Sequence, residues 1–409
     1  MQSGCTSSKQ VSDLSDFQAW VNITKSGMGL AFLTMPSVVG KVGFIPGFVV
    51  TAVVFAGSLW LTLLIKTCKD KVEHRENVET DPLRMAEASL RQESQMNGGL
   101  AWDSGMGYFD EVMCAAFGQM GRSCAVLGVL LVQIFTGVLY VSTIAESVPA
   151  SFPEWSRNRV LLAVAIICSI MSLTDRLRRV AWLSTAAALT YLVVFALLVY
   201  EGSKHRQTTQ VKVSLWKGTG YDYGPLCAVA SFLFSSFVLT DCVHREMSNK
   251  DHFVYVTTAG YLAMLVGGLC FGFVGYACYG GEAEDLIYLN FPSSSRLLCV
   301  LCVSAILSVS IILNEVPIFL FLQAQLPNVP HAIVNISVVS CVVFIAYLLP
   351  DIMTILDTFQ NVADIFVLWI MPAACFFKLS NRYERFEQFW TAASVLLGIV
   401  VVVVGFASS

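Results

Sequence analysis

Long apolar runs separated by short polar connections fill almost the whole chain of 409 residues. Most of these runs reach the roughly 20 residues with which a helix crosses the hydrocarbon core of a bilayer. They lack the strict alternation of a barrel strand, and inside lipid only a helix or a closed barrel pairs every backbone group. The pattern therefore predicts an all-α polytopic membrane protein with about 11 transmembrane helices. The predicted spans are residues 17–39, 44–65, 125–145, 160–173, 180–200, 223–243, 254–278, 297–322, 332–349, 352–377 and 388–407.

Composition supports this fold class and excludes several classes of function. Hydrophobic residues make up 56% of the chain and charged residues 13%, whereas soluble domains contain about a quarter charged residues. We therefore expect no enzyme, and the sequence carries no Ser/His/Asp grouping, phosphate-binding glycine loop or His-Glu metal motif. The net charge of −4 and the lack of a basic-aromatic patch argue against nucleic acid as a partner.

The 13 cysteines fall mostly inside apolar runs, where a thiol behaves as a small hydrophobic group. Their spacing matches no disulfide framework or metal site. The nearest approach to a ligand cluster is Asp241, Cys242 and His244, which lacks a second matching pair. We interpret this cluster as a solvated helix end and expect neither a metal nor a bound cofactor.

The orientation in the membrane follows from the ends of the spans. Residues 1–16 are polar and contain no cleavable signal sequence, so the first span should insert and leave the N-terminus in the cytosol. Positive residues favour the cytosolic side of a membrane. Of the 25 Lys and Arg residues, 16 fall on the side of the N-terminus, 8 fall on the opposite side, and Lys25 lies within the first span. The longest polar stretch, residues 66–122, is then a cytosolic loop, with a short amphipathic helix expected around residues 83–90.

The first span contains a feature that disfavours a continuous helix. Gly27 and Gly29 follow Ser26 and precede Pro36, and each glycine costs about 1 kcal/mol relative to alanine in a helix. A break at mid-membrane would free N–H groups on the outer half-helix and C=O groups on the inner one. The N–H groups can hold a carboxylate, and the C=O groups can hold a cation or an ammonium group. The alternative is close packing of this helix on a neighbour through its small residues.

The sixth span has a second weak point in residues 231–238, which read Ser-Phe-Leu-Phe-Ser-Ser-Phe-Val. Ser235 and Ser236 can bond freed backbone, while Phe232 and Phe234 can enclose a small ligand. The alternative is that the serines bond within an intact helix and the rings face lipid. Spans one and six would begin the two halves of a five-plus-five inverted repeat, where discontinuous helices are expected.

Several motifs resemble those of the amino acid/auxin permease family. Residues 29–36, which read Gly-Leu-Ala-Phe-Leu-Thr-Met-Pro, resemble the family's Gly-x-Gly-Ile-Leu-x-Leu-Pro signature. Residues 232–236, with Glu246 and Met247 downstream, resemble its sixth-helix motif. Further similar segments, in the same order as in the family, are residues 173–179, 271–276, 289–292 and 349–351, and Pro372 followed by Lys378 and Leu379.

This resemblance implies a leucine-transporter-type fold with a five-plus-five inverted repeat plus one extra helix. Residues 1–16 would be a cytosolic segment and residues 17–409 the transporter domain. Within that domain, residues 17–200 would form the first repeat, 223–377 the second and 388–407 the extra helix. The implied function is secondary active transport of amino acids by alternating access, coupled to a proton or sodium gradient. Ala31 replaces the second glycine of the signature, which also admits a sensor or scaffold of the same fold that binds amino acids but barely transports them.

The resemblance also implies where an amino acid would bind. Backbone at the first break would contact its carboxylate and amine, and side chains at the second break would shape the pocket for its side chain. In the third span, Gln133 and Tyr140 are further candidates for the pocket. The complete set of substrate-binding candidates is Ser26, Gly27, Met28, Gly29, Leu30, Ala31, Gln133, Tyr140, Phe232, Phe234, Ser235 and Ser236.

Ion coupling has its own candidates. Glu315 in the eighth span and Asp364 in the tenth are carboxyl groups within apolar runs, where a charge costs about 2.5–3.5 kcal/mol on insertion scales, so either could carry a proton. The alternative is a structural carboxyl that bonds a neighbouring helix. A sodium ion between the first break and the eighth span would need oxygen ligands, for which Ser304 and Ser308 are available.

The partners expected from the sequence are an amino-acid substrate and membrane lipid, and we expect a monomer. The plasma membrane and a vacuolar or lysosomal membrane both remain open as locations. The identity of the amino acid, the coupling ion and the direction of transport also remain open.

Overall fold

The computed structural model describes residues 14–78, 108–173, 177–218, 222–349, 365–380 and 385–408. These residues are almost entirely helical, and among them the one β-type contact is an isolated bridge between Leu14 and Met247. The helices are α1 (Asp16–Gly27), α2 (Leu30–Val42), α3 (Phe44–Val78), α5 (Phe109–Ser151), α6 (Arg157–Ser172), α7 (Leu177–Thr208), α8 (Tyr223–Leu233), α9 (Phe237–Glu246), α10 (Phe253–Tyr279), α11 (Ser293–Gln325), α12 (His331–Leu348), α14 (Met371–Leu379) and α15 (Arg385–Ser408). The short turns are η2 (Lys250–His252), η3 (Gly280–Glu282), η4 (Ile287–Asn290) and the π-helical turn η5 (Phe366–Ile370).

As far as the structure describes them, the predicted spans coincide with one helix or with two consecutive helical elements. Within the described ranges, seven helical stretches are long and apolar enough to cross a membrane, and two further apolar helices are shorter. The first and sixth predicted spans are each divided in two, into α1 and α2 and into α8 and α9. Residues 350–364 of the predicted tenth span, and the amphipathic helix expected around residues 83–90, lie outside the described residues.

The third span begins earlier than its apolar run. Helix α5 starts at Phe109, within the stretch predicted as loop, and it bends at Gly118, whose φ of 68° suits glycine because a Cβ would strain that conformation. An ion pair across the bend joins Arg122 Nε to the buried Asp110 Oδ2 at 3.1 Å. The polar start of the helix is therefore anchored to its apolar part. Hydropathy alone did not reveal this segment because it mixes apolar residues with charged ones such as Asp110, Glu111 and Arg122.

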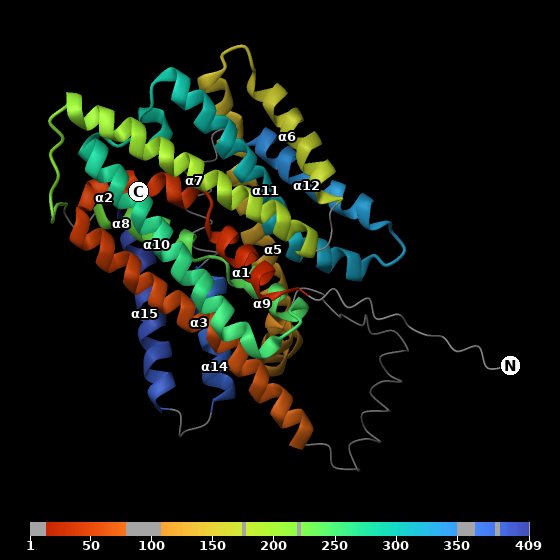
Figure 1. The fold of residues 1–409 in the computed structure, drawn as a ribbon. Helices are drawn as coiled ribbons and strands as arrows, with labels where there is room; N and C mark the ends of the chain where they lie inside the picture. The colour runs from red at the N-terminus through yellow and green to blue at the C-terminus, as the bar shows by residue number, and fades with distance from the viewer. Residues whose placement is uncertain are drawn as a thin grey trace.

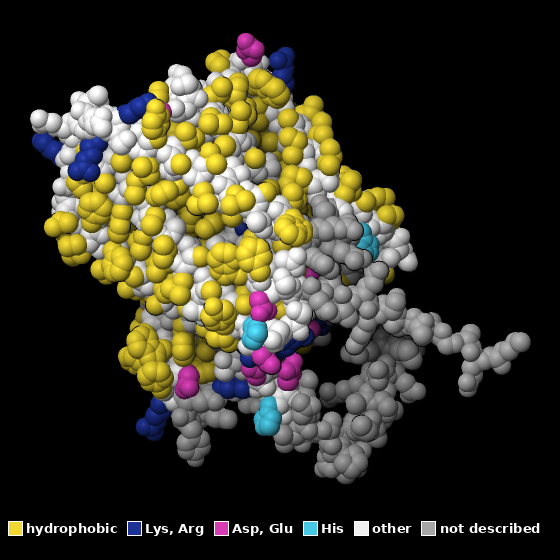
Figure 2. Space-filling view, viewed as in Figure 1, with side chains coloured by type: hydrophobic (Ala, Val, Ile, Leu, Met, Phe, Trp, Pro, Cys, Tyr) yellow, Lys and Arg dark blue, Asp and Glu magenta, His cyan; other side chains and the backbone are white. Residues whose placement is uncertain are grey.

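Apolar side chains fill the interior and also cover the middle of the outer surface. Leu162 on α6, Trp182 on α7 and Leu396 on α15 are 64%, 70% and 64% exposed, which water would penalise but lipid would not. Figure 2 shows hydrophobic side chains across the middle of the molecule, with Lys, Arg, Asp and Glu gathered toward its two ends. This is the surface expected of a protein that spans a bilayer.

The broken helices lie at the centre of the bundle (Figure 1). Helix α1 packs against α7 and α10, and α2 packs against α10 and α8. Helices α5 and α11 form the most extensive pair, and α6 and α12 cover one side of it. We call the end of the bundle where α1 begins and α9 ends the N-side, and the end where α2 finishes the opposite side.

The close approach of α10 to α2 depends on a glycine. A Cβ placed on Gly275 would lie 2.5 Å from both Cβ and Cγ of Pro36, which sits within α2 and cannot turn away because its ring is rigid. Gly281 in η3 differs, because the nearest atom to its Cβ position is Lys217 Nζ at 3.3 Å, at the end of a flexible side chain. The two glycines form a matched pair for testing this packing.

We expect Gly275→Ala to destabilise the protein by about 1–3 kcal/mol, because overpacking must push α10 away from α2. Gly281→Ala should change the stability little, since the lysine can move. Thermal unfolding of both purified variants in detergent measures the difference. Equal unfolding temperatures for the two variants would contradict the proposed role of Gly275.

Candidate functional site

The first span breaks at the glycines that the sequence singled out. Helix α1 ends at Gly27 and α2 begins at Leu30, so Met28 and Gly29 form a short non-helical link in the middle of the bundle. Within this link, the N–H of Gly29 donates to the carbonyl of Gly27 at 2.9 Å. The break leaves carbonyl groups at the end of α1 and N–H groups at the start of α2 without their helical partners.

The glycines also allow the two broken helices to touch. A Cβ on Gly27 would collide with the carbonyl oxygen of Leu233 at the end of α8 and with Met264 Sδ. A Cβ on Gly29 would lie 2.5 Å from the hydroxyl of Tyr140 on α5. The sequence left a break and close packing through small residues as alternatives, and in the structure these glycines serve both.

A tyrosine and a lysine bond the carbonyl groups at the first break. The hydroxyl of Tyr191 on α7 lies 2.8 Å from both the Met28 and the Gly29 carbonyl oxygens, as a donor shared between them. Lys25 Nζ, at the end of α1, donates to the Met28 carbonyl at 3.0 Å and also to Ser310 Oγ on α11. Both side chains are buried, so these bonds take the place of hydrogen bonds to water.

The second break has a similar arrangement. Residues 234–236 separate α8 from α9, and Ser235 Oγ donates to the carbonyl of Phe232 at 2.8 Å, as expected for a serine beside freed backbone. The hydroxyl of Tyr261 on α10 lies 3.5 Å from the Phe234 carbonyl and 2.8 Å from Thr62 Oγ1 on α3. At each break, therefore, a tyrosine from another helix lies within hydrogen-bond distance of a backbone carbonyl.

Only some of the predicted pocket residues gather around the first break. The ring of Phe232 lies 6.0 Å from that of Tyr140, which in turn packs on Gly29. Phe234 instead stacks on Tyr261 and packs against Phe55, on the side of α3 and α10. Tyr140 on α5 therefore contacts the first break, and Phe232 on α8 packs against its ring.

The remaining substrate-binding candidates lie on α1, α2 and α5. Leu30 and Ala31 are buried in the first turn of α2, while the hydroxyl of Ser26 donates to the Ile23 carbonyl within α1. Gln133 is buried two turns before Tyr140 on α5, and its backbone carbonyl accepts from Asn314 Nδ2 at 2.8 Å.

The ion-coupling candidates Ser304, Ser308 and Glu315 recur at helical spacing and so lie along one face of α11. Ser308 Oγ donates to the carbonyl of Ser304 within that helix at 2.8 Å, and the serine that contacts the first break through Lys25 is Ser310. Glu315 is completely buried, and neither of its carboxyl oxygens has a hydrogen-bond partner among the described residues. It faces Gly137 on α5, on another side of α11 than Ser310, the serine that contacts Lys25. Asp364 lies outside the described residues.

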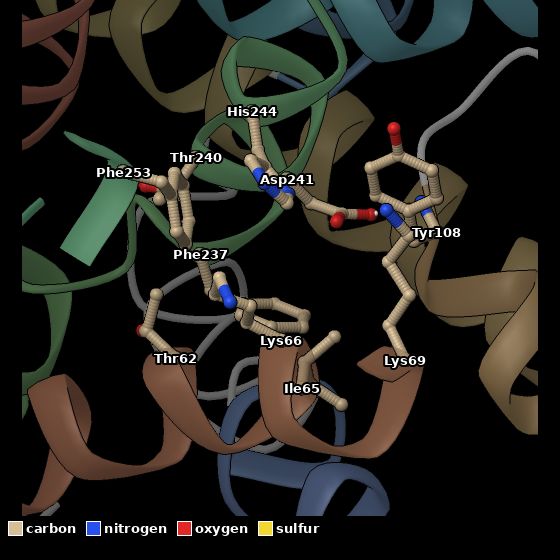
Figure 3. Close-up of a pocket in the computed structure, with 10 residues that line it drawn as sticks. All are labelled: Thr62, Ile65, Lys66, Lys69, Tyr108, Phe237, Thr240, Asp241, His244 and Phe253. Carbon is tan, nitrogen blue, oxygen red and sulfur yellow. Dashed lines mark hydrogen bonds between the residues drawn. The ribbon is translucent and has the colours of Figure 1, made fainter. Parts of the chain in front are cut away.

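A pocket opens on the N-side of the second break (Figure 3). Its walls come from α3, from the start of α5, from α9 and from the start of α10. The side chains combine lysines, one carboxylate and aromatic rings. The lining residues are Thr62, Ile65, Lys66, Lys69, Tyr108, Phe237, Thr240, Asp241, His244 and Phe253.

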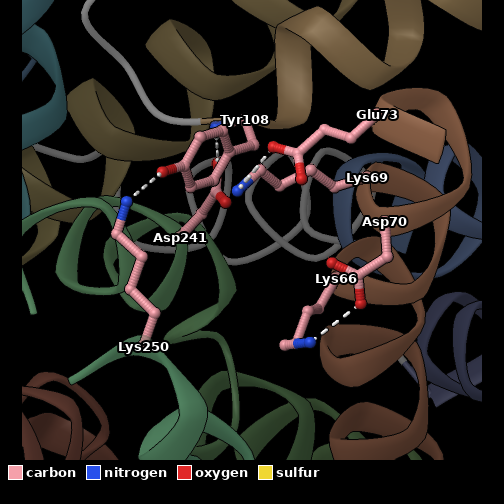
Figure 4. Close-up of polar contacts among 7 residues, drawn as sticks. All are labelled: Lys66, Lys69, Asp70, Glu73, Tyr108, Asp241 and Lys250. Carbon is pink, nitrogen blue, oxygen red and sulfur yellow. Dashed lines mark hydrogen bonds and ion pairs between the residues drawn. The ribbon is translucent and has the colours of Figure 1, made fainter. Parts of the chain in front are cut away.

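Asp241 joins α9 to the start of α5 across this pocket. Its Oδ2 accepts from the backbone N–H of Tyr108 at 2.6 Å and from that of Phe109 at 2.9 Å, where α5 begins (Figure 4). The ring of Tyr108 carries Lys69 Nζ over its face, 3.5 Å from the centroid, and its hydroxyl accepts from Lys250 Nζ at 3.4 Å. A carboxylate at a helix N-terminus satisfies orphan donors and interacts well with the helix dipole.

The interpretation of residues 241–244 as a solvated helix end is wrong. Asp241, Cys242 and His244 are all buried, and the His244 ring packs against Phe253 with centroids 4.1 Å apart. Hydropathy missed this because the residues that contact the cluster come from other helices. Tyr108 and Phe109, at the start of α5, precede it by more than a hundred residues, and Phe253 on α10 follows it by several. The available signal was a carboxylate within the mostly apolar residues 237–243.

The opposite side is closed by the segment that contains η3 and η4. Asp285 in that segment accepts from Ser37 Oγ on α2 at 2.9 Å and lies 3.7 Å from Lys41 Nζ. The hydroxyl of Tyr288 bonds Ser147 Oγ on α5, and burial raises the pKa of the Tyr288 phenol above its usual value. The central break therefore lies between a packed cover on one side and the Asp241 contacts on the other.

Known proteins resemble this chain in both sequence and fold. A family model described as transmembrane amino acid transporter protein matches residues 13–409. The amino acid transporter ANT1 of Arabidopsis thaliana is 22% identical over 324 residues, which are 74% of this chain and 67% of that protein. The amino acid transporter AVT1J of Arabidopsis thaliana is 26% identical over 190 residues, which are 43% of this chain and 44% of that protein.

Two solved structures of Mhp1, a nucleobase-cation-symport-1 family transporter, have the same overall fold. The closed conformation with bromovinylhydantoin bound matches with a TM-score of 0.59 and 12% identity, over 97% of this chain and 92% of Mhp1. The inward-facing conformation matches with a TM-score of 0.57 and 13% identity, over 97% and 89%. The likeness concerns the fold alone, and it confirms the predicted leucine-transporter-type fold.

We expect Tyr191→Phe to destabilise the protein by about 1–3 kcal/mol, because it removes the hydroxyl that bonds two carbonyl groups buried at the first break. Tyr255→Phe on α10 is the control, since the Tyr255 side chain is 77% exposed. Thermal unfolding in detergent measures both variants. A Tyr191 variant as stable as the Tyr255 variant would mean that the break does not depend on this hydroxyl.

We expect Asp241→Ala to loosen the start of α5, because the N–H groups of Tyr108 and Phe109 lose their acceptor. Hydrogen–deuterium exchange should be faster at these two amides, while exchange within the apolar part of α5 stays slow. The control is Asp251→Ala, which removes an exposed carboxylate from η2 on the same side. Unchanged exchange at residues 108–109 in the Asp241 variant would show that the cap is dispensable.

Proposed function

The chain belongs to the family of transmembrane amino acid transporter proteins, and we propose that it is a secondary active transporter that moves amino acids by alternating access, driven by a proton or sodium gradient. The family and the transporter fold support transport of amino acids across a membrane. The same findings argue against an enzyme. The proposal adds the mode of transport, the driving gradient and the residues that take part.

The observation that carries the proposal is the meeting of two broken helices at the centre of the bundle. At the first break, N–H groups at the start of α2 can bind a carboxylate, and carbonyl groups at the end of α1 can bind an ammonium group. Every free amino acid carries both charges a short distance apart. Phe232 and Tyr140 adjoin the same place and would contact the substrate's side chain.

Alternating access would move the two half-helices of the N-side together. Leu14 donates through its backbone N–H to the Glu246 carbonyl at 2.9 Å, and its own carbonyl accepts from the N–H of Ser248 at 3.1 Å. His252 and Asp16 add a side-chain contact of 2.6 Å between their ring nitrogen and carboxylate. Because these bonds tie α1 to α9, we propose that both swing as one unit once Asp241 releases α5.

Coupling to protons would use a carboxyl group that is buried and changes its protonation as the bundle changes shape. Glu315 fits this role, because it is completely buried in α11 without a described hydrogen-bond partner. It contacts α5 rather than the break, so its effect on the substrate would pass through the packing of α5 and α11. Ser304, Ser308 and Asp364 remain proposals for ion coupling.

A second candidate function is an amino-acid sensor or scaffold of the same fold. The buried Ala31 and the contact of Tyr140 with Gly29 favour it, because both reduce the space beside the first break. For either function we propose a monomer in the plasma membrane or a vacuolar or lysosomal membrane. The N-side would face the cytosol, as the distribution of Lys and Arg predicts.

The test is uptake of a panel of labelled amino acids into proteoliposomes of the purified protein, with an inward proton or sodium gradient imposed or collapsed. Saturable uptake that falls when one gradient is removed would support the coupled carrier. Thermal stabilisation by an amino acid without any uptake would support the sensor. If the panel produces neither effect, both functions are wrong.

We expect Gly29→Val to abolish saturable uptake while the protein still folds, because the new side chain collides with the Tyr140 hydroxyl at the break. The matched control is Ala196→Leu, which adds the same number of carbon atoms on the exposed face of α7. Size-exclusion chromatography checks folding and the uptake assay checks function. Normal uptake by a well-folded Gly29 variant would contradict binding at this break.

A further inference from the structure

Lys25 is a lysine buried at the centre of the bundle. It lies in the last turn of α1, two residues before the break, and its side chain has no exposure. Among the described residues it forms no ion pair with a carboxylate, and Glu315 faces α5 from another side of α11. A cation at this depth is costly unless other groups compensate its charge. What surrounds Lys25 therefore shows why it is tolerated there.

The groups around Lys25 Nζ are those that a protein uses to hold a cation. Nζ donates to the Met28 carbonyl at 3.0 Å and to Ser310 Oγ, which itself donates onward to the Ile306 carbonyl at 3.1 Å. Nζ also lies 5.6 Å from the centroid of the Tyr191 ring, within the range of a cation–π interaction. These contacts use oxygen lone pairs and a ring face, with no neutralising carboxylate in the part of the chain that the structure describes.

The position also coincides with the negative end of a helix dipole. Helix α1 ends at Gly27, so its unpaired carbonyl groups point toward the break. In transporters built on inverted repeats, unwound carbonyls and half-helix C-termini are where a co-transported cation is coordinated. Here Lys25 places an ammonium group of the chain itself between those carbonyls and α11.

We propose that the Lys25 ammonium is a built-in cation that fills the position between the first break and α11, and so makes transport by this protein independent of sodium. This inference rests on the proposed function, because it concerns the driving ion of that transport. The ammonium bonds the Met28 and Ser310 oxygens that a metal ion would need. A sodium ion at the same place would also meet an adjacent like charge.

The neighbouring serines support the exclusion of sodium. Ser304 and Ser308, the two hydroxyls that could have served as sodium ligands, lie on another face of α11 than Ser310, which contacts Lys25. Ser310, which does face the break, is engaged by Lys25. Proton coupling at a separate residue, with Glu315 as the proposed carrier, is compatible with this arrangement.

The first test measures binding without any transport. Thermal unfolding of the purified full-length protein is compared in sodium chloride and in choline chloride at equal ionic strength. We expect no difference for the wild type. Lys25→Ala should unfold at a lower temperature in choline chloride and recover by at least about 3 °C in sodium chloride or in methylammonium chloride, since either small cation can enter the vacated position. The control Lys212→Ala removes an exposed lysine and should behave as wild type.

Two outcomes would overturn the proposal. The first is stabilisation of the wild type by sodium relative to choline, which would show an open sodium site. The second is a folded Lys25→Ala variant that responds to neither sodium nor methylammonium, which would show that Lys25 leaves no cation position behind. If Lys25→Ala does not fold, Lys25→Arg replaces it. Arg keeps the charge and should remain insensitive to sodium, and a sodium response in that variant would equally contradict the proposal.

The second test uses uptake in proteoliposomes. Wild-type uptake should be the same whether sodium or choline is present on both sides, and a loss of uptake on replacing sodium by choline would overturn the inference. The two proposals fail separately in this design. Absence of uptake of every amino acid under every gradient contradicts the proposed function, whereas the thermal measurement needs no amino acid and still decides whether Lys25 occupies a cation position.

Discussion

The structure depends on one constraint, which is that backbone groups freed by a broken helix must find partners where lipid supplies none. Both breaks meet this constraint with side chains from other helices. Tyr191 on α7 bonds two carbonyls of the first break, and Tyr261 on α10 lies near a carbonyl of the second. Because the partners come from α7 and α10, the position of each break is fixed relative to the rest of the bundle.

The same constraint explains why small residues and large aromatic side chains occur together at the centre. Gly27 lets the first break approach the carbonyl of Leu233 at the second, and Gly29 admits the Tyr140 hydroxyl. The packing leaves backbone polar groups close together in an otherwise apolar interior. Such a place can bind a small zwitterion through its two charges while the surrounding rings exclude water, which is why the breaks carry the proposed function.

At the N-side, the contacts that hold the half-helices in place are also those that the proposed opening would have to break. The two half-helices there are tied through Leu14 and the chain around Met247, while Asp241 fastens one of them to the start of α5. A few hydrogen bonds at a half-buried pocket are easier to exchange than the long apolar contacts between α5 and α11. The polar N-side contacts are therefore the part of the bundle best suited to open, and the α5–α11 pair is the part best suited to stay fixed.

Sequence alone predicted the all-helical membrane fold, because lipid makes helix formation follow directly from apolar length. It also indicated where both helices break, because glycine pairs and adjacent serines act on local backbone. The family motifs supplied the fold type, which the similarity to Mhp1 confirmed.

Only the tertiary structure decided which side chains meet. Lys25 joins Met28 and Ser310, Phe234 faces away from Phe232, and Asp241 caps a helix that begins 132 residues earlier. These contacts depend on how helices distant in sequence pack and rotate against each other, and hydropathy contains no information about that rotation.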